Sequence, residues 1–172
     1  MTVRRLRAPP ASPFLGDLRR FYHWDSHDAP LRHGELGMVE IYHALFAHHP
    51  PWARGLLRLR DWLVRPFGLK PSMKSFDEPI RIQSSYAVGD RMARFVLFSQ
   101  SDREIVTGGD DRHLDFRVSV RRLEQGGGER IVLSTVVSPH NFLGKAYLFV
   151  VLPFHYFGIR KMLANGCGNA TL

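Results

Sequence analysis

Histidine and carboxylate side chains alternate in two segments of this chain, a pattern that can support acid–base chemistry or metal binding. In the first segment, Asp111, His113, Asp115 and Arg117 would share one face of a strand, because side chains alternate across a strand. A histidine flanked by carboxylates can act as a general base whose ring is oriented by an aspartate. The four side chains could equally form a solvent-facing ladder of ion pairs, since the intervening positions are apolar and would face the core.

The second segment, HWDSHD, starts at position 23. On a strand, His23, Asp25 and His27 would lie on one side, and two imidazoles with a carboxylate are ligands that zinc or iron accepts. No third histidine at a fixed spacing supports a metal site, and the residues from 25 to 37 are polar and contain Pro30 and Gly34. We therefore expect a loop over 25–37, and no bound metal or cofactor.

A third group of polar residues accompanies the apolar stretch near the C-terminus. Tyr147, Val151 and His155 are spaced four apart, so on a helix they lie near one stripe that could face a ligand. Alternatively, His155 bonds a neighbouring strand, while His140 and Asn141 satisfy the start of the helix.

Two further features have both a functional and a purely structural interpretation. Arginines near Trp52 and Trp62 could bind nucleic acid by phosphate contact and stacking, or could form a solvated helix face. These arginines are Arg54, Arg58, Arg60 and Arg65. The single cysteine, Cys167, excludes an internal disulfide and lies in a Gly-rich stretch, where we expect an incidental thiol.

Length and composition limit the class of protein. The 172 residues suit one domain, and 44% hydrophobic with 23% charged residues is ordinary for a globular protein and excludes collagen and long disorder. The net charge of +8 comes mostly from arginines before residue 76, and no recognised nucleic-acid module accompanies it. The N-terminus has charge but no apolar h-region, so we expect a cytoplasmic protein.

The periodicity of apolar residues predicts the elements that position these groups. A flexible basic arm covers 1–13, a single domain covers 14–164, and a flexible tail covers 165–172. Within the domain, a first strand begins in 14–24, and two short helices over 38–48 and 52–64 meet at Pro50 and Pro51. Strands follow at 81–88, 91–98, 104–107, 113–123 and 130–137, and the last helix spans 140–164 with Pro153 inside it.

This order predicts an α+β helix-grip fold, in which a curved antiparallel sheet of about six or seven strands wraps around the long C-terminal helix. Such an arrangement commonly leaves a cavity between the sheet and the helix. The stretch 146–154 is apolar on every face, so the helix should be covered on most sides. It is too short and interrupted for a clean membrane span, but a homodimer or peripheral membrane contact is an alternative.

Three stretches together resemble an uncharacterised bacterial family of domains of unknown function. They are GGDDRHLDFRVSV (108–120), STVVSPHNFLGKAYL (134–148) and LPFHYFGIRKML (152–163), and PPWARGLLRLRDWLVRPFGLK (50–70) also fits. Lys145 stands where we expect an arginine, which keeps the charge. The family is similar to the helix-grip superfamily of polyketide cyclases, START-type lipid carriers and Bet v 1 allergens. That resemblance implies a cavity for a hydrophobic ligand but no particular reaction.

Three hypotheses about function follow. The first is a small hydrophobic or amphipathic ligand bound between sheet and helix, against Phe95, Leu97, Phe116, Val118, His140, Tyr147, Val151, Phe154 and His155. The second is a cyclase- or dehydratase-like enzyme that uses His113 or His155 as the base, with Asp115 or Tyr147. The third is surface binding, of nucleic acid by the Arg-rich helix or of a membrane or second subunit by the last helix. The sequence does not decide whether a reaction is catalysed.

Overall fold

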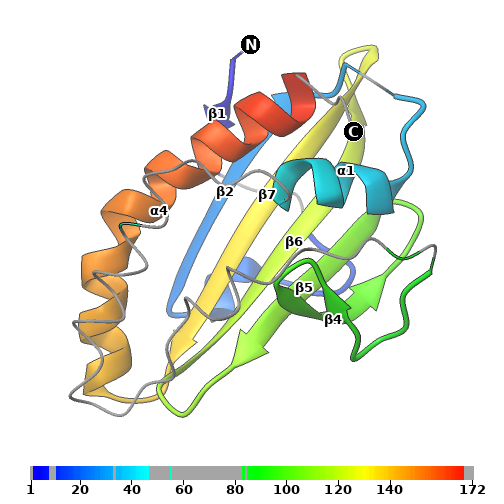
Figure 1. Ribbon diagram of the computed structural model, residues 1–172. Helices are drawn as coiled ribbons and strands as arrows, with labels where there is room; N and C mark the ends of the chain where they lie inside the picture. Colours follow the sequence, from blue (N-terminus) through cyan, green and yellow to red (C-terminus); the bar gives the residue numbers. More distant parts are fainter. Residues whose placement is uncertain are drawn as a thin grey trace.

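A curved antiparallel sheet and a long C-terminal helix dominate the computed structural model (Figure 1), which describes residues 2–7, 11–32, 34–46, Gly55, 83 and 85–168. Within those residues the sheet has seven strands in the order β1-β2-β7-β6-β5-β4-β3, every neighbouring pair antiparallel. The strands are β1 (Arg4–Arg5), β2 (His23–Pro30), β3 (Arg91–Met92), β4 (Phe95–Gln100), β5 (Glu104–Asp110), β6 (Leu114–Gln125) and β7 (Gly128–Pro139). The helical elements are η1 (Leu18–Arg20), α1 (Met38–Phe46) and α4 (Phe142–Gly168). This α+β arrangement confirms the predicted fold class.

The β6–β7 hairpin sets the register of the sheet. Its turn places Gly126 and Gly127 at φ of +63° and +78°, a left-handed conformation that glycine adopts without steric cost. The two strands then pair from Gln125 opposite Gly128 to Leu114 opposite Pro139. Because side chains alternate, this register sends Val118 and Val120 to one face of the sheet and Arg117 and Ser119 to the other.

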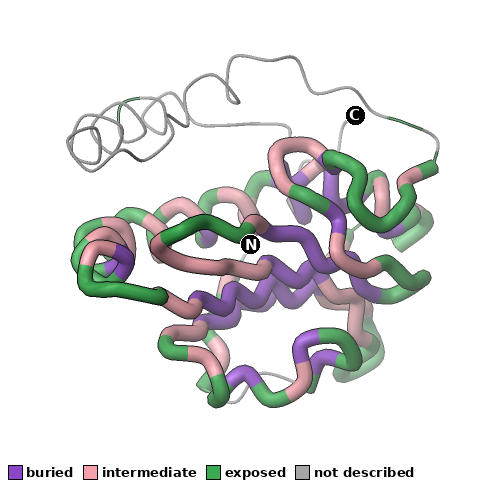
Figure 2. The backbone as a smooth tube through the Cα atoms, turned by 90° about the horizontal axis from the view of Figure 1, so that it is seen from below, coloured by how far each residue is buried: buried purple, intermediate pink, exposed green. Residues whose placement is uncertain are grey.

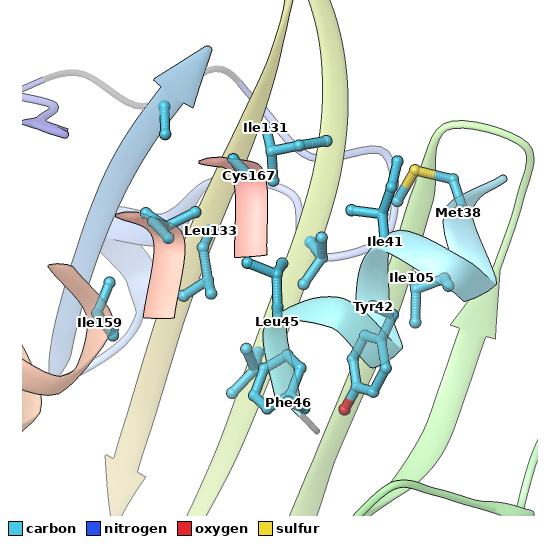
Figure 3. Close-up of a cluster of buried hydrophobic side chains, with 14 of the residues drawn as sticks. Met38, Ile41, Tyr42, Leu45, Phe46, Ile105, Ile131, Leu133, Ile159 and Cys167 are labelled. Atoms are coloured by element: carbon cyan, nitrogen blue, oxygen red, sulfur yellow. The ribbon is translucent and has the colours of Figure 1, made fainter. Parts of the chain in front are cut away.

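The main core lies on the face of the sheet that packs against α1 and α4, which we call the helix face. Ile131 and Leu133 of β7 meet Leu45 of α1 and Ile159 of α4 there, as Figure 3 shows, and all four side chains are buried. Seen from below, the buried residues concentrate in the strands in the middle of the molecule (Figure 2). The apolar spacing in α1 and α4 therefore reflects burial against one sheet.

The alternation in β6 suggested that the opposite face of the sheet is exposed to solvent. In the structure, part of that face is covered. The segment before β2 packs on it, and Leu15 and Leu18 are buried there with Val106 and Val136. Under this cover the carboxylate of Glu104, 1% exposed, accepts hydrogen bonds from the hydroxyls of Ser12 (2.5 Å) and Ser119 (2.6 Å). The buried apolar residues on the two faces thus form two separate cores, one on each side of the sheet.

The last helix ends later than predicted. We expected a helix to 164 and a tail from 165, whereas α4 continues to Gly168. Gly166 and Cys167 are buried in the structure, and a Cβ at Gly166 would lie 2.6 Å from Cδ2 of Leu45. Contact with α1 therefore keeps this Gly-rich stretch helical, a tertiary effect that local propensity does not show.

Several other boundaries also differ. The predicted loop over 25–37 was wrong, because its first half forms β2, whose polar side chains are buried in ion pairs. The predicted arm contains β1, whose Arg4 binds Asp28 at 2.7 Å. The predicted strand 91–98 is divided into β3 and β4 at Ala93, which has a φ of 54°. Residues 83 and 85–88 form no strand, and the predicted helix 52–64, with its Arg cluster, lies outside the described residues.

Candidate functional site

Three histidines surround one buried aspartate where α4 crosses β2. The Asp25 side chain is fully buried, and its Oδ1 accepts a hydrogen bond from Nε2 of His155 at 3.0 Å. Nδ1 of His27 lies 3.2 Å from Oδ2, an ion-pair contact without hydrogen-bond geometry, and Nε2 of His23 lies 3.9 Å from Oδ1. We call these four residues the Asp25 cluster.

Strand geometry and the tertiary fold each contribute part of the cluster. The two-residue period of β2 places His23, Asp25 and His27 on the helix face, as their alternation predicts. His155 comes from α4, 130 residues later in the chain. The sequence contained the signal for the first three, but the loop expected over 25–37 obscured it. No local pattern predicts the contact with His155.

The charges within the cluster stabilise the carboxylate form of Asp25. Burial alone would raise its pKa, but the hydrogen bond from His155 and the electrostatic attraction of the His155 and His27 rings outweigh burial and lower the pKa to about 2. Burial lowers the pKa of His23, against the opposing effect of the Asp25 charge. Asp25 is therefore ionised at neutral pH, whereas His23 favours its neutral form.

The hydrogen bond between Asp25 and His155 defines what the cluster can do chemically. When Nε2–H of a neutral imidazole donates to the carboxylate, Nδ1 is left as an acceptor. The His155 side chain, which carries this second nitrogen, is 24% exposed. A small molecule can therefore reach the ring. Such a pair can accept a hydrogen bond from a hydroxyl group or remove a proton from it.

Neighbouring polar atoms extend the cluster. The hydroxyl of Tyr156 lies 3.4 Å from Nε2 of His23, and the guanidinium of Arg5 lies 4.8 Å from the centre of the Tyr156 ring. Thr135 pairs with Asp25 across β2 and β7, and its buried Oγ1 has no hydrogen-bond partner within the described part of the chain. In that same part of the chain, no group of three or more histidine, cysteine or carboxylate side chains could hold a metal ion.

The structure places the other predicted acid–base residues at the start of α4. His140 pairs with Asp115 at 3.0 Å, and Nδ1 of His113 lies 3.0 Å from Nδ2 of Asn141. Asn141 also caps α4, because its Oδ1 accepts a hydrogen bond from the backbone N–H of Gly144 at 3.0 Å. These contacts support the structural interpretation of His113, Asp115 and His140, which join the β5–β6 turn to the helix.

The expected ladder along β6 is divided between different partners. Arg117 binds Asp110 at 2.5 Å and lies 3.6 Å above the ring of Phe98. Asp111 accepts a hydrogen bond from the backbone of Arg112 at 2.5 Å. The predicted set therefore does not act as one cluster.

The predicted apolar lining residues also fall into two groups. Phe95 and Phe116 make an edge contact at 5.3 Å and pack with Leu97 and Val118 in the core beside α1. The rest of the set lies on α4, where Tyr147 and Val151 are half-buried and Phe154 is 43% exposed. An open groove of about 500 Å³ lies elsewhere, between the start of α1 and the β4–β5 turn, lined by Met38, Glu40, Gln100 and Asp102 among others.

Comparisons with known proteins identify a family but no activity. The family model described as "Protein of unknown function (DUF2867)" matches residues 18–162. No curated protein and no solved structure matches the chain. The match spans β2 to β7 and most of α4, and so contains the whole Asp25 cluster.

Proposed function

Because the chain belongs to the DUF2867 family of proteins of unknown function, its family assigns it no activity. We propose that it binds a small amphipathic molecule beside α4. The polar end of that molecule is held by His155 and Asp25. Its apolar part lies along the helix face of β6 and β7. The observation that carries this proposal is the partly exposed imidazole of His155, fixed by a fully buried carboxylate.

The polar anchor favours an uncharged hydroxyl end. Asp25 is ionised, so a second carboxylate brought beside it would add like-charge repulsion. A hydroxyl can donate to the free nitrogen of His155 and accept from the Thr135 hydroxyl, which is buried without a partner within the described residues.

The apolar part of the proposed site comes from residues that are not fully packed. Leu114 and Phe116 are half-buried, although they share a face of β6 with Val118 and Val120, which are buried. Tyr147 and Val151 of α4 are half-buried as well. Apolar walls with a few convergent polar groups are the usual composition of small-molecule sites.

A second candidate function is acid–base catalysis at the same pair, of the cyclase or dehydratase type. The 3.0 Å contact between Nε2 of His155 and the buried Asp25 carboxylate favours it, since an aspartate that orients an imidazole is a common arrangement for a general base. In this case, incubation with the protein would convert the bound molecule, for example by loss of water, and the conversion would require His155.

Titration of histidine-labelled protein with matched probes tests the binding proposal. We would record ¹H–¹⁵N spectra of ¹⁵N-histidine-labelled protein with 1-octanol and with octanoate, which differ only in the polar end. We expect saturable shifts of the His155 signals with 1-octanol and at least about fivefold weaker binding of octanoate, because like charges near Asp25 cost on the order of 1 kcal/mol.

Two substitutions give the matched comparison. His155→Gln retains an amide donor for Asp25 but removes the second ring nitrogen, and it should weaken 1-octanol binding. His140→Gln alters a second histidine–aspartate pair with the same 3.0 Å separation, located at the exposed start of α4, and should leave binding unchanged. Equal affinity of His155→Gln and the parent protein, or no saturable shift with either probe, would contradict the proposal. Native mass spectrometry of protein from cell extract would then identify any natural ligand by mass.

A further inference from the structure

The outer side of α4 carries a concentration of exposed aromatic side chains. Phe142 and Phe149 are 85% and 82% exposed, and Phe154 and Phe157 are 43% and 53% exposed. Large hydrophobic residues with this much exposure are informative when they are contiguous, because scattered ones occur on every protein. Here they lie on one helix within 16 positions of one another, which indicates a surface with an apolar partner.

Helical geometry places three of these four phenylalanines on one stripe. At about 100° per residue, Phe142, Phe149 and Phe157 fall within about 80° of one another around the helix axis. The buried residues Leu148 and Ile159 fall about 80–180° from these three phenylalanines around the axis. Up to Ile159, the exposed phenylalanines and the buried residues therefore occupy different parts of the helix surface, and α4 lies along the outside of the sheet (Figure 1).

Every charged residue of α4 is basic. Lys145, Arg160 and Lys161 are exposed, and residues 142–168 contain no aspartate or glutamate. Nζ of Lys145 lies 5.4 Å from the ring centre of Tyr22, which is itself 62% exposed, so the patch extends onto the segment before β2. An aromatic stripe with basic residues at both ends complements a surface that is apolar inside and anionic at its boundary.

By length and composition, Phe142–Cys167 is also apolar enough to cross a membrane. Crossing would require its inner side to leave the core. Leu163 and Cys167 are buried against α1 and the sheet, and His155 is bonded to Asp25. These contacts favour a helix that stays on the sheet and presents only its outer side.

We propose that the outer side of α4 docks the protein onto the surface of an anionic phospholipid bilayer, with the helix parallel to the membrane plane. The exposed phenylalanines enter the boundary between headgroups and acyl chains, while Lys145, Arg160 and Lys161 contact lipid phosphates. This docking surface faces away from the Asp25 cluster, so it does not depend on the proposed ligand site.

Vesicle flotation of the full chain tests the docking surface. Vesicles of phosphatidylcholine alone would be compared with vesicles containing phosphatidylglycerol, at low and high salt. We expect at least tenfold stronger association with the anionic vesicles and a marked loss at high salt, because lipid charge attracts the basic residues. Equal association with both vesicle types, or none, would overturn the proposal.

Paired variants separate the apolar and electrostatic contributions. Phe142→Ser with Phe149→Ser should reduce vesicle binding at least tenfold, whereas Val88→Ser, at a 70% exposed residue of a distant turn, should not. Lys145→Glu with Lys161→Glu should abolish the preference for anionic lipid. The same change of charge in Arg32→Glu with Arg103→Glu should preserve it.

A reporter and an oligomer measurement complete the test. A tryptophan introduced by Phe149→Trp should show a blue-shifted emission on anionic vesicles, because its ring enters a less polar environment. Light scattering would reveal a dimer instead, if a second copy covers this face. A dimer that the double phenylalanine variant dissociates, together with an unshifted tryptophan emission, would overturn the membrane proposal in favour of self-association.

Discussion

The pH dependence of stability provides a direct test of the Asp25 cluster. Asp25 is buried, and its pKa is lowered from the ordinary 3.8 to about 2. A group with a depressed pKa in the folded state stabilises the fold above its unfolded pKa, and that stability is lost as the pH falls through the folded pKa. We therefore expect Asp25 to contribute fully at pH 7 and to contribute nothing well below pH 2.

The size of the effect follows from the difference between the two pKa values. At about 1.36 kcal/mol per pKa unit, the difference between 3.8 and about 2 corresponds to about 2.5 kcal/mol of unfolding free energy. About half of this contribution should be lost by pH 3, where the unfolded chain binds a proton at Asp25 but the folded protein largely does not. The asparagine variant, Asp25→Asn, cannot ionise and should lack this part of the pH dependence.

Urea unfolding followed by circular dichroism, between pH 7 and pH 3, measures the effect. Asp25→Asn should be less stable than the parent protein at pH 7 by about 2–3 kcal/mol, and the two stability curves should converge as the pH falls. The control is Asp115→Asn, which removes a surface carboxylate from a histidine pair of equal length and should cost less than about 1 kcal/mol. If the parent and Asp25→Asn curves stay parallel throughout, Asp25 is not the stabilising carboxylate and the reasoning is refuted.

Three further predictions concern α4. Leu163→Ala, at a fully buried residue, should lower the unfolding free energy by about 2–5 kcal/mol in urea titrations, whereas Phe142→Ala, at a residue 85% exposed, should change it by less than about 0.5 kcal/mol. Gly144→Ala should destabilise the protein in thermal unfolding, because a Cβ there would clash with a backbone carbonyl oxygen of the β5–β6 turn. Gly128→Ala should be tolerated, because a Cβ at that position would have no atom within 4 Å. The Cys167 thiol is buried and its pKa is raised to about 12, so it should react with a thiol reagent only after unfolding; rapid reaction of the native protein would show that the end of α4 opens.

The two proposals use different sides of the same helix. The inner side of α4 contributes His155 to the Asp25 cluster, and the outer side contributes exposed phenylalanines between basic residues. A helix that is apolar on every side has no strong preference of its own for one orientation. Polar contacts set its rotation, above all the bond from His155 to Asp25 and the cap at Asn141.

Local sequence patterns determined much of the fold. The alternation in β6 and β7 and their glycine turn predicted the central hairpin, because a two-residue period and positive φ angles are local requirements. The long apolar segment predicted the C-terminal helix, and its order after the strands predicted a sheet packed on that helix. The alternation of His23, Asp25 and His27 also placed three side chains on one face of a strand.

Only the tertiary structure decided which of these groups form a site. From the sequence, the residues from Asp25 onward were expected to form a loop. The polar composition of a buried strand resembles that of a loop until the partners of its side chains are known. The sequence offered His113 and His155 as alternative candidates for the base. Packing places His113 at an exposed helix cap and His155 on a buried carboxylate. The physical reason is that a buried charge is stable only beside partners that satisfy it. For Asp25, the decisive partner is His155, which lies 130 residues later in the chain. Only the packing of α4 on the sheet brings the two side chains together.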